Sequence, residues 1–366
     1  MGRVKIVVVA VVALLAGCTG SPSPAATTSP AASTSSPTSV SVTSQADVAT
    51  DLPVPWGIAF LPSGDAVVTL RDEKRLVLVA PTGEVTDVTG PGAADLSDIV
   101  VPGGEGGLLG VTVLGTDGDA TDLALYATAA DDNRVLRATL TGTSLGPVRP
   151  ILTGIAKANN HDGGRLAVGP DGFLYVTTGD ASDTANAQDP ASLNGKILRI
   201  TADGDPAPGN PTAGSPVWTL GHRNPQGLGW AADGRMFAAE FGQNTWDELN
   251  VIEPGSNYGW PEVEGIGGRD GFVDPVAQWS TDEASPSGLA VTDDAVYLAA
   301  LRGERLWRVP LTPDGVGTPQ ALLTDLGRLR AVTVAPDGSL WVLTNNTDGR
   351  GTPHPGDDRV VRITVG

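Results

Sequence analysis

Four segments of the chain combine glycines with polar side chains that have no evident structural role. They are the stretches 103–110 (GGEGGLLG), 159–166 (NNHDGGRL), 221–227 (GHRNPQG) and 242–250 (GQNTWDELN), the last running on to Pro261. Glu105 is the side chain of the first segment able to do chemistry, and His161, in the second, is one of three histidines. A lone histidine is more often structural than catalytic, and His222 could simply support the neighbouring pair Arg223 and Asn224. The four segments are therefore candidates for a site, provided that the elements between them bring them together.

Several common catalytic sites have no support in the sequence. The glycines of segment 103–110 are not followed by Lys or by Ser/Thr, so this segment does not resemble a phosphate-binding loop. The chain contains neither a His-Glu-x-x-His nor a Gly-x-Ser-x-Gly motif. Its single cysteine excludes an internal disulfide framework and a four-cysteine zinc site.

The composition indicates a chain that folds around a sizeable core and does not bind nucleic acid. Of its 366 residues, 40% are hydrophobic. Acidic residues outnumber basic ones 42 to 23, which gives a formal net charge of -19. Phosphate binding needs clustered Lys and Arg, so this balance argues against nucleic acid as a partner and suits a small ligand or a cation.

The amino-terminal segment reads as a targeting signal followed by a tether. Arg3 and Lys5 precede an apolar run over residues 6–15, which is too short to span a bilayer. The run ends in Leu-Ala-Gly-Cys at residues 15–18, which resembles the lipobox of bacterial lipoproteins. We therefore expect a signal peptide at 1–17, lipidation of Cys18, a Ser/Thr/Pro/Ala-rich tether over 18–45, and an extracytoplasmic protein anchored to the membrane by lipid. An ordinary secretory signal is the alternative.

The remainder of the chain repeats one pattern six times. Each copy has a Gly or Asp turn, a short strand, polar residues and a second strand, and the turns follow one another at intervals of about 44 to 62 residues. The strand pairs are AVVTL/RLVLVA, LALYATA/RVLRATL, FLYVTTG/KILRIT, RMFAAE/ELNVI, AVYLAAL/RLWRVPL and SLWVLTN/RVVRITV. This period predicts an all-β, six-bladed β-propeller over residues 46–366, closed by strand 359–365 against strands near the amino end. An array of β-sandwiches is the alternative fold.

Long motifs in a fixed order connect this pattern to a known family. Over residues 48–366 the chain resembles the soluble quinoprotein glucose/sorbosone dehydrogenases, and within them the bacterial aldose sugar dehydrogenases. The resemblance rests on GGEGGLLG, NNHDGGRLAVGPDGFLYVTTGD, AQDPASLNGKILRI, GHRNPQGLGW, TWDELNVIEPGSNYGWPEVEG, ASPSGLAV, LRGERLWRV, GRLRAVTVAPDGSLWVLT and DDRVVRI. It implies a propeller that uses pyrroloquinoline quinone (PQQ) with calcium and oxidises the anomeric hydroxyl of an aldose to a lactone.

The resemblance assigns catalytic roles to three residues. His161 falls on the family's base and would take the hydroxyl proton while hydride leaves for PQQ. Arg223 would stabilise the developing oxyanion. Glu105 stands where glucose-preferring enzymes have Gln. Asn160 stands where the family often has an Asp that orients the base, so this orienting contact is expected to be weaker here.

The resemblance also implies sites for the cofactor and for calcium. The residues matched to PQQ binding are Asn224, Gln226, Arg302, Arg328 and Arg330, and arginines suit the three carboxylates of PQQ. A calcium that bridges PQQ would use the carbonyl groups of Gly242 and Gln243, and a second, structural calcium would use Glu248 and Tyr258.

Two other functions remain open on the fold alone. Six-bladed propellers also serve as calcium-dependent lactonases and as non-catalytic ligand-binding modules. If the chain is a dehydrogenase, the partners are an aldose, an electron acceptor that the sequence does not specify, and the membrane through the lipid anchor. The chain lacks the longer loop insertions that wall in a sugar, so we expect it to accept several aldoses.

Overall fold

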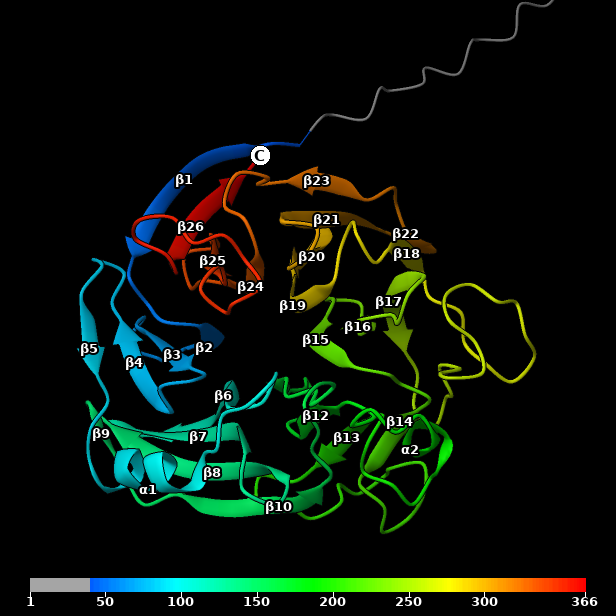
Figure 1. Ribbon diagram of the computed structural model, residues 1–366, viewed down its shortest axis with the longest axis horizontal. Helices are drawn as coiled ribbons and strands as arrows, with labels where there is room; N and C mark the ends of the chain where they lie inside the picture. Colours follow the sequence, from blue (N-terminus) through cyan, green and yellow to red (C-terminus); the bar gives the residue numbers. More distant parts are fainter. Residues whose placement is uncertain (1–39) are drawn as a thin grey trace, which may run out of the picture. The chain divides into compact units, whose positions relative to one another are not determined.

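The computed structural model describes residues 40–366, and it confirms the six-bladed β-propeller. Six sheets, each of four or five strands, stand in a ring (Figure 1). The signal peptide, Cys18 and the tether up to residue 39 lie outside the described residues. Blades are numbered here in chain order.

Every blade is an antiparallel sheet of short strands. Blade 1 has β2 (Pro55–Phe60), β3 (Ala66–Leu70), β4 (Arg75–Val79) and β5 (Val85–Asp87). Blade 2 has β6 (Leu108–Asp117), β7 (Ala120–Thr128), β8 (Asn133–Thr141), β9 (Ser144–Leu145) and β10 (Arg149–Ile155). Blade 3 has β11 (Leu166–Val168), β12 (Leu174–Thr178), β13 (Lys196–Ile200) and β14 (Val217–Leu220).

The second half of the ring follows the same plan. Blade 4 has β15 (Pro225–Trp230), β16 (Met236–Glu240), β17 (Trp246–Ile252) and β18 (Ala277–Ser280). Blade 5 has β19 (Pro286–Val291), β20 (Ala295–Ala300), β21 (Arg305–Thr312), β22 (Gly315–Val316) and β23 (Gln320–Leu322). Blade 6 has β24 (Leu329–Val334), β25 (Leu340–Thr344), β26 (Val360–Val365) and β1 (Val42–Ala49). The described residues also form two short helices, α1 (Pro91–Ile99) and α2 (Ala185–Gln188), and neither is long and apolar enough to cross a membrane.

The six predicted strand pairs are the second and third strands of the six blades. Their residues are mostly buried because both faces of a middle strand pack against neighbouring blades; all five residues of β3, for example, are buried. The glycine turns before them need a left-handed backbone that glycine adopts without strain. Gly64, with φ 91°, closes the turn into β3, and its N–H donates to the carbonyl of Leu61 at 2.9 Å.

The ring closes as predicted, through strands from the two ends of the described chain. β1 pairs antiparallel with β26, from Val42 opposite Val365 to Ala49 opposite Val360 (Figure 1). Blade 6 therefore takes its outermost strand from the amino-terminal side. β1 begins at Val42, four residues before the boundary expected at 46, because Ser, Thr and Gln of the expected tether can still pair with an edge strand. Between blades 6 and 1, Phe60 packs edge-on against Trp341 with ring centroids 4.9 Å apart.

The antiparallel order of the strands determines where the polar segments meet. Turns that join first to second strands lie at one end of a blade, whereas loops that join second to third strands, or one blade to the next, lie at the other end. Segments 103–107, 159–165 and 221–224 precede the first strands β6, β11 and β15, and segment 241–245 joins the second strand β16 to the third strand β17. All four candidate segments therefore come to the same face of the propeller.

Candidate active site

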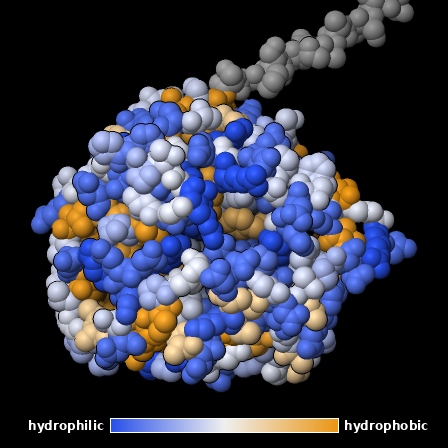
Figure 2. Space-filling view, viewed as in Figure 1, coloured by the Kyte–Doolittle hydropathy of each residue, from blue (hydrophilic) through white to orange (hydrophobic). Residues whose placement is uncertain are grey.

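A polar cavity of about 370 Å³ lies among these loops. Its lining contains four arginines, Arg302, Arg328, Arg330 and Arg350. The other lining residues are Glu105, Gln226, Phe241, Ser285 and Leu301. In Figure 2 the centre of the face is hollowed, and mainly hydrophilic residues surround the hollow. Such a cavity, with a fixed excess of positive charge in a chain of net charge -19, is suited to a ligand with several negative charges.

His161 lies on the same face, and a buried carboxylate fixes its ring. His161 Nδ1 lies 2.7 Å from Oδ1 of Asp180, whose side chain is fully buried. The other carboxylate oxygen of Asp180 accepts a hydrogen bond of 2.9 Å from Nε1 of Trp260. When Nδ1 donates to Asp180, Nε2 is left as a free base, which is the tautomer that can accept a proton.

The orienting carboxylate therefore exists, but it is Asp180 and not the residue at position 160. Asn160 does not contact the imidazole; its side chain and its carbonyl accept from Ser182 Oγ at 2.8 and 3.3 Å. Asp180 stands at the end of VTTGD, two residues after β12 ends, and the second-to-third loop of blade 3 carries it to the face where His161 lies. The expectation of a weakly oriented base was wrong. An acidic residue directly after a predicted second strand was the signal that could have identified it.

Glu105 holds the backbone of His161 rather than its ring. One carboxylate oxygen of Glu105 accepts from the N–H of His161 at 3.0 Å, and the other accepts from Arg350 Nη1 at 3.1 Å. His161 has a left-handed backbone, with φ 65°, which costs energy for a residue with a Cβ. The contact with Glu105 helps to hold it there, and it links the loops of blades 2, 3 and 6.

Arg223 and Asn224 directly follow a buried histidine, His222, whose contacts fix the backbone of this segment. His222 is fully buried, and its Nδ1 lies 2.8 Å from a carboxylate oxygen of Glu240, whose other oxygen accepts from the N–H of Arg223. In this structure His222 thus supports the Arg–Asn pair. The Arg223 guanidinium lies over Trp260 at 5.5 Å, and its Nε is buried without a partner in the described residues. Burial lowers the pKa of Arg223.

Asn224 connects this support to the loop of the histidine. Its side-chain oxygen accepts from the N–H of Gly163 at 3.0 Å. Asn224 is itself buried, so it positions the segment that carries His161 from the interior of the protein.

Two of the three arginines matched to cofactor binding are buried in the cavity wall. Arg330 donates to Asn345 at 2.7 Å and to the side-chain oxygen of Gln226 at 3.1 Å, and burial lowers its pKa to about 9. Arg328 pairs with Asp348 at 3.2 Å, and its Nε is buried without a partner among residues 40–366. Arg302 differs from both, since its side chain is 60% exposed and pairs with Asp282 at the rim.

The segment expected to hold calcium has backbone carbonyl oxygens that accept no hydrogen bond in the described part of the chain. Within residues 40–366, no hydrogen-bond donor reaches the carbonyl oxygens of Gly242, Gln243 or Tyr258, so these oxygens remain available to a cation. Beneath them, one carboxylate oxygen of Glu264 accepts from the N–H groups of residues 243 to 246, at 2.7 to 3.3 Å. Glu264 was not predicted; it lies in the long loop between β17 and β18.

Glu248 and Tyr258 lie around a narrow crevice that also contains Glu240 and Glu264. Burial and the nearby charge of Glu240 raise the pKa of Glu248. A cation in this crevice would offset that charge repulsion. Within the described part of the chain, no group of three or more His, Cys, Asp or Glu side chains is arranged to hold a metal ion by itself.

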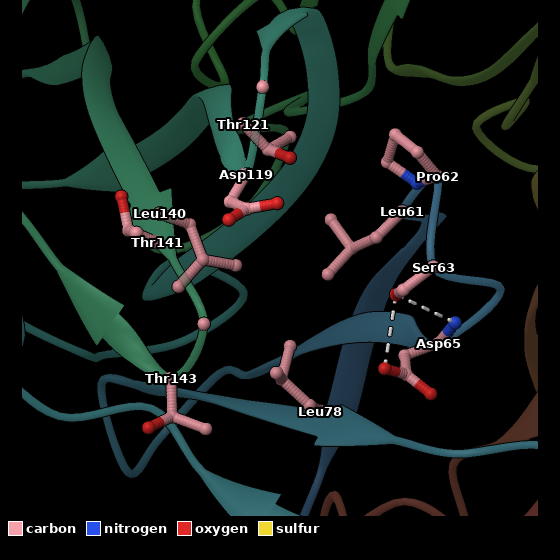
Figure 3. A pocket seen from close by; sticks show the side chains of 12 residues that line it. Leu61, Pro62, Ser63, Asp65, Leu78, Asp119, Thr121, Leu140, Thr141 and Thr143 are labelled. Carbon is pink, nitrogen blue, oxygen red and sulfur yellow. Dashed lines mark hydrogen bonds between the residues drawn. The ribbon is translucent and has the colours of Figure 1, made fainter.

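A larger hollow, of about 750 Å³, lies away from this site between blades 1 and 2 (Figure 3). It is lined by the first-to-second turns of both blades and by the turn after β8, so it opens at the opposite end of the strands. Ser63 and Asp65 hydrogen-bond to each other there at 3.0 Å, and Leu61, Leu78 and Leu140 supply apolar surface. None of the candidate site residues lines it.

Comparisons with known proteins agree on one family. A family model described as Glucose / Sorbosone dehydrogenase matches residues 52–352. Aldose sugar dehydrogenase YliI of Escherichia coli is 30% identical over 84% of this chain and 91% of its own length. The PQQ-bound form of an aldose sugar dehydrogenase from Streptomyces coelicolor is 51% identical, with a TM-score of 0.83 over 90% of this chain and 98% of that one. The soluble aldose sugar dehydrogenase of Escherichia coli in its apo form has a TM-score of 0.75 at 25% identity, over 89% of this chain and 99% of that one.

Proposed function

The chain belongs to the glucose/sorbosone dehydrogenase family, and on this premise we propose that it is a PQQ-dependent aldose sugar dehydrogenase that oxidises the anomeric hydroxyl to a lactone. One observation of the structure carries the proposal. A base held by a buried carboxylate, His161 with Asp180, stands on the same face as a cavity whose wall is rich in arginine. The likeness to calcium-dependent lactonases or binding propellers rests on the fold alone, so the dehydrogenase is favoured.

The residues of the cavity fit a quinone with three carboxylates. Arg328 and Arg330 are buried and fixed by neighbours, and Arg328 keeps one buried N–H without an acceptor in the described chain. A bound carboxylate would supply that acceptor and would offset the cost of burying the positive charges. Gln226 and Arg302, which line the cavity, would contact the group, whereas Asn224, which is buried outside the lining, would act by positioning the loop of His161 through Gly163. When bound, PQQ would accept two electrons and the hydrogen of the anomeric carbon as hydride.

The protein side of the reaction is proton removal and charge stabilisation. His161 would take the proton of the anomeric hydroxyl at Nε2, while Asp180 stabilises the imidazolium that forms. The Arg223 guanidinium, which donates to the carbonyl of Phe241 at 3.3 Å and lies over Trp260, would donate to an oxygen that gains negative charge during the reaction. Glu105 would keep the strained His161 backbone in place and face the sugar as a hydrogen-bond acceptor.

Calcium forms part of the same proposal. The uncommitted carbonyl groups of Gly242 and Gln243 would bind one ion next to the quinone, and Glu248 with the Tyr258 carbonyl would bind a second ion that ties down the loop. Lipid attachment at Cys18, with a membrane anchor outside the cytoplasm, is likewise proposed on the lipobox. Radiolabelled palmitate should enter the native chain and not the Cys18→Ala variant.

Reconstitution tests the activity. Apoprotein should reduce a redox dye in the presence of an aldose after PQQ and calcium are both added, and should produce the lactone. His161→Ala should lose about 10²–10⁴-fold in kcat while still binding PQQ. His354→Ala, whose side chain is 65% exposed, is the matched control and should keep the wild-type rate. Turnover in a chelator without PQQ, or lactone hydrolysis without redox chemistry, would contradict the proposal.

A further inference from the structure

The central channel of the propeller contains a positive charge that no acidic residue on its wall balances. The channel has a volume of about 420 Å³ and is walled by the first strand of each of the six blades. Its lining is Ile58, Ala59, Phe60, Val111, Thr112, Val113, Arg165, Leu166, Ala167, Val168, Leu228, Gly229, Trp230, Leu289, Val332, Thr333 and Val334. Arg165 is the one charged residue of this lining.

Arg165 is held at the end of the channel that lies nearer the candidate active site, directly before β11. Its Nε donates to the carbonyl of Gln226 at 2.7 Å, and its guanidinium lies over the ring of Trp56 at 4.3 Å. Its backbone N–H donates to Thr177 Oγ1 at 2.9 Å. The side chain is therefore held in place, although no salt bridge within residues 40–366 accounts for its charge.

The remaining donors of Arg165 have no partner in the described chain. Nη2 is buried without a hydrogen bond, and no hydrogen bond from Nη1 is present within residues 40–366. Burial alone lowers the pKa of Arg165 to about 9, since no carboxylate of the described chain lies near enough to act on it. A buried guanidinium nitrogen without an acceptor in the described chain requires an anion or water.

We propose that the channel holds a small monovalent anion of the halide class, such as chloride, bound to Arg165. One positive charge with no second cation on the channel wall suits a single negative charge and not a phosphate. More of the channel surface is polar than apolar, and the hydroxyls of Thr112 and Thr333 belong to it, so an ion at Arg165 can keep part of its hydration. A halide accepts hydrogen bonds from any direction, as the remaining guanidinium donors require.

The proposed halide site and the arginine-rich cavity share two neighbouring residues, Gln226 and Trp56. Gln226 accepts from Arg165 by its carbonyl and from Arg330 by its side chain, and both guanidinium groups lie over Trp56. Centroid distances of 4.3 and 5.8 Å keep the two guanidinium carbons within about 10 Å of each other. A halide on Arg165 would stabilise the native protein, because it would accept a hydrogen bond from the buried Nη2. The halide site itself does not depend on the proposed activity.

Bromide diffraction locates the ion directly. Crystals of the wild-type protein grown without chloride and soaked in sodium bromide should show an anomalous peak in the channel beside Arg165. Arg165→Gln crystals should lack this peak. Peaks confined to the outer surface, or only ordered water at Arg165, would overturn the proposal.

Thermal unfolding provides a second measurement on the protein in solution. The Tm of the apoprotein should rise by about 2–4 °C for each tenfold increase in chloride above its Kd, relative to gluconate at the same ionic strength. The difference between the two salts should vanish in Arg165→Gln and persist in Arg149→Gln, a control that removes an arginine 52% exposed on β10. Equal Tm values in both salts for the wild type would contradict a halide site. If Arg165→Gln does not fold, the wild-type comparison and the bromide map still decide the question.

Discussion

Replacing Asp180 by Asn separates the tautomer of His161 from its position. In the native chain one oxygen of Asp180 lies 2.7 Å from His161 Nδ1 and accepts from the N–H of Ser182 at 2.8 Å, while the other accepts from Trp260 Nε1 at 2.9 Å. Asn offers one oxygen and one NH₂ group in nearly the same volume. Whichever way the amide is turned, one neighbouring N–H faces the NH₂ group, and that clash costs about 1–3 kcal/mol.

The two orientations have different consequences for the base. With its oxygen toward His161, the new amide preserves the productive tautomer but no longer offers a charge to the imidazolium. With its NH₂ toward His161, the amide accepts at Trp260 and forces the imidazole proton onto Nε2, where it blocks the base. A charge-assisted hydrogen bond is worth about 1.5–3 kcal/mol, and an unproductive tautomer population adds to that loss. We expect a barrier higher by about 3–5 kcal/mol, which corresponds to a fall in kcat of about 10²–10⁴-fold.

The assay is stopped-flow reduction of the reconstituted enzyme by an aldose, with PQQ affinity measured in parallel. Asp180→Asn should bind PQQ as the wild type does and should show its loss in the reductive step. Asp183→Asn is the matched control, because Asp183 lies in the same loop, is exposed, and caps the N–H of Ala185 at 3.2 Å without contacting His161. A rate for Asp180→Asn within about threefold of the wild type would refute the assignment of His161 as a base oriented by Asp180.

Four further outcomes follow from the structure. Calcium added to the apoprotein should raise the Tm, because a ligand that binds the native state alone stabilises it; an unchanged Tm in a calorimetric titration would argue against both calcium sites. Arg350→Ala should change kcat/KM by less than about fivefold, because its ion pair with Glu105 is half exposed and worth at most about 1 kcal/mol; steady-state kinetics would show a larger effect if Arg350 bound the cofactor. Burial raises the pKa of Asp162 from 3.8 to about 6. The stability that Asp162 contributes is therefore complete below its unfolded pKa of 3.8 and is lost as pH rises through 6, by about 3 kcal/mol in all. Urea titrations at pH 5 and 8 should show about half of this loss of stability, and Asp162→Asn should reduce the loss. Glucose, galactose, xylose, arabinose and maltose should have kcat/KM values within about tenfold of one another, and a preference of about a thousandfold for one sugar would contradict an open site.

The sequence predicted the middle of each blade better than its edges. Second and third strands such as β3 and β4 are short apolar runs, and a glycine turn precedes β3, so the local pattern was enough. The outer strands carry exposed polar residues; β1, with the sequence VTSQADVA, follows the composition of the tether and becomes a strand only because β26 offers it a free edge. Pairing across the whole length of the propeller is not visible in a local pattern.

The candidate site shows the same division. The glycine-rich motifs that contain His161, Arg223 and Glu105 could be found from their residue types, and the order of the strands brings them to one face. Asp180 and Glu264 could not be found in this way, since each acts on a partner about 20 residues away and its role depends on how a loop folds back. Arg350 meets Glu105 across 245 positions, which only the closed ring permits.

The seam between β1 and β26 also determines how the propeller would respond to mechanical load. Val42 lies opposite Val365, so the outer ends of the two strands emerge at the same end of the sheet. Force applied between these ends would separate the backbone hydrogen bonds one pair at a time, as a zipper opens, whereas strands loaded in opposite directions along their length resist with all their bonds at once. This seam is therefore weaker against a pull on its two ends together than against a pull along the strands. A pull on the amino-terminal end of β1 alone, with no force on the carboxyl end of β26, does not load the seam in this way.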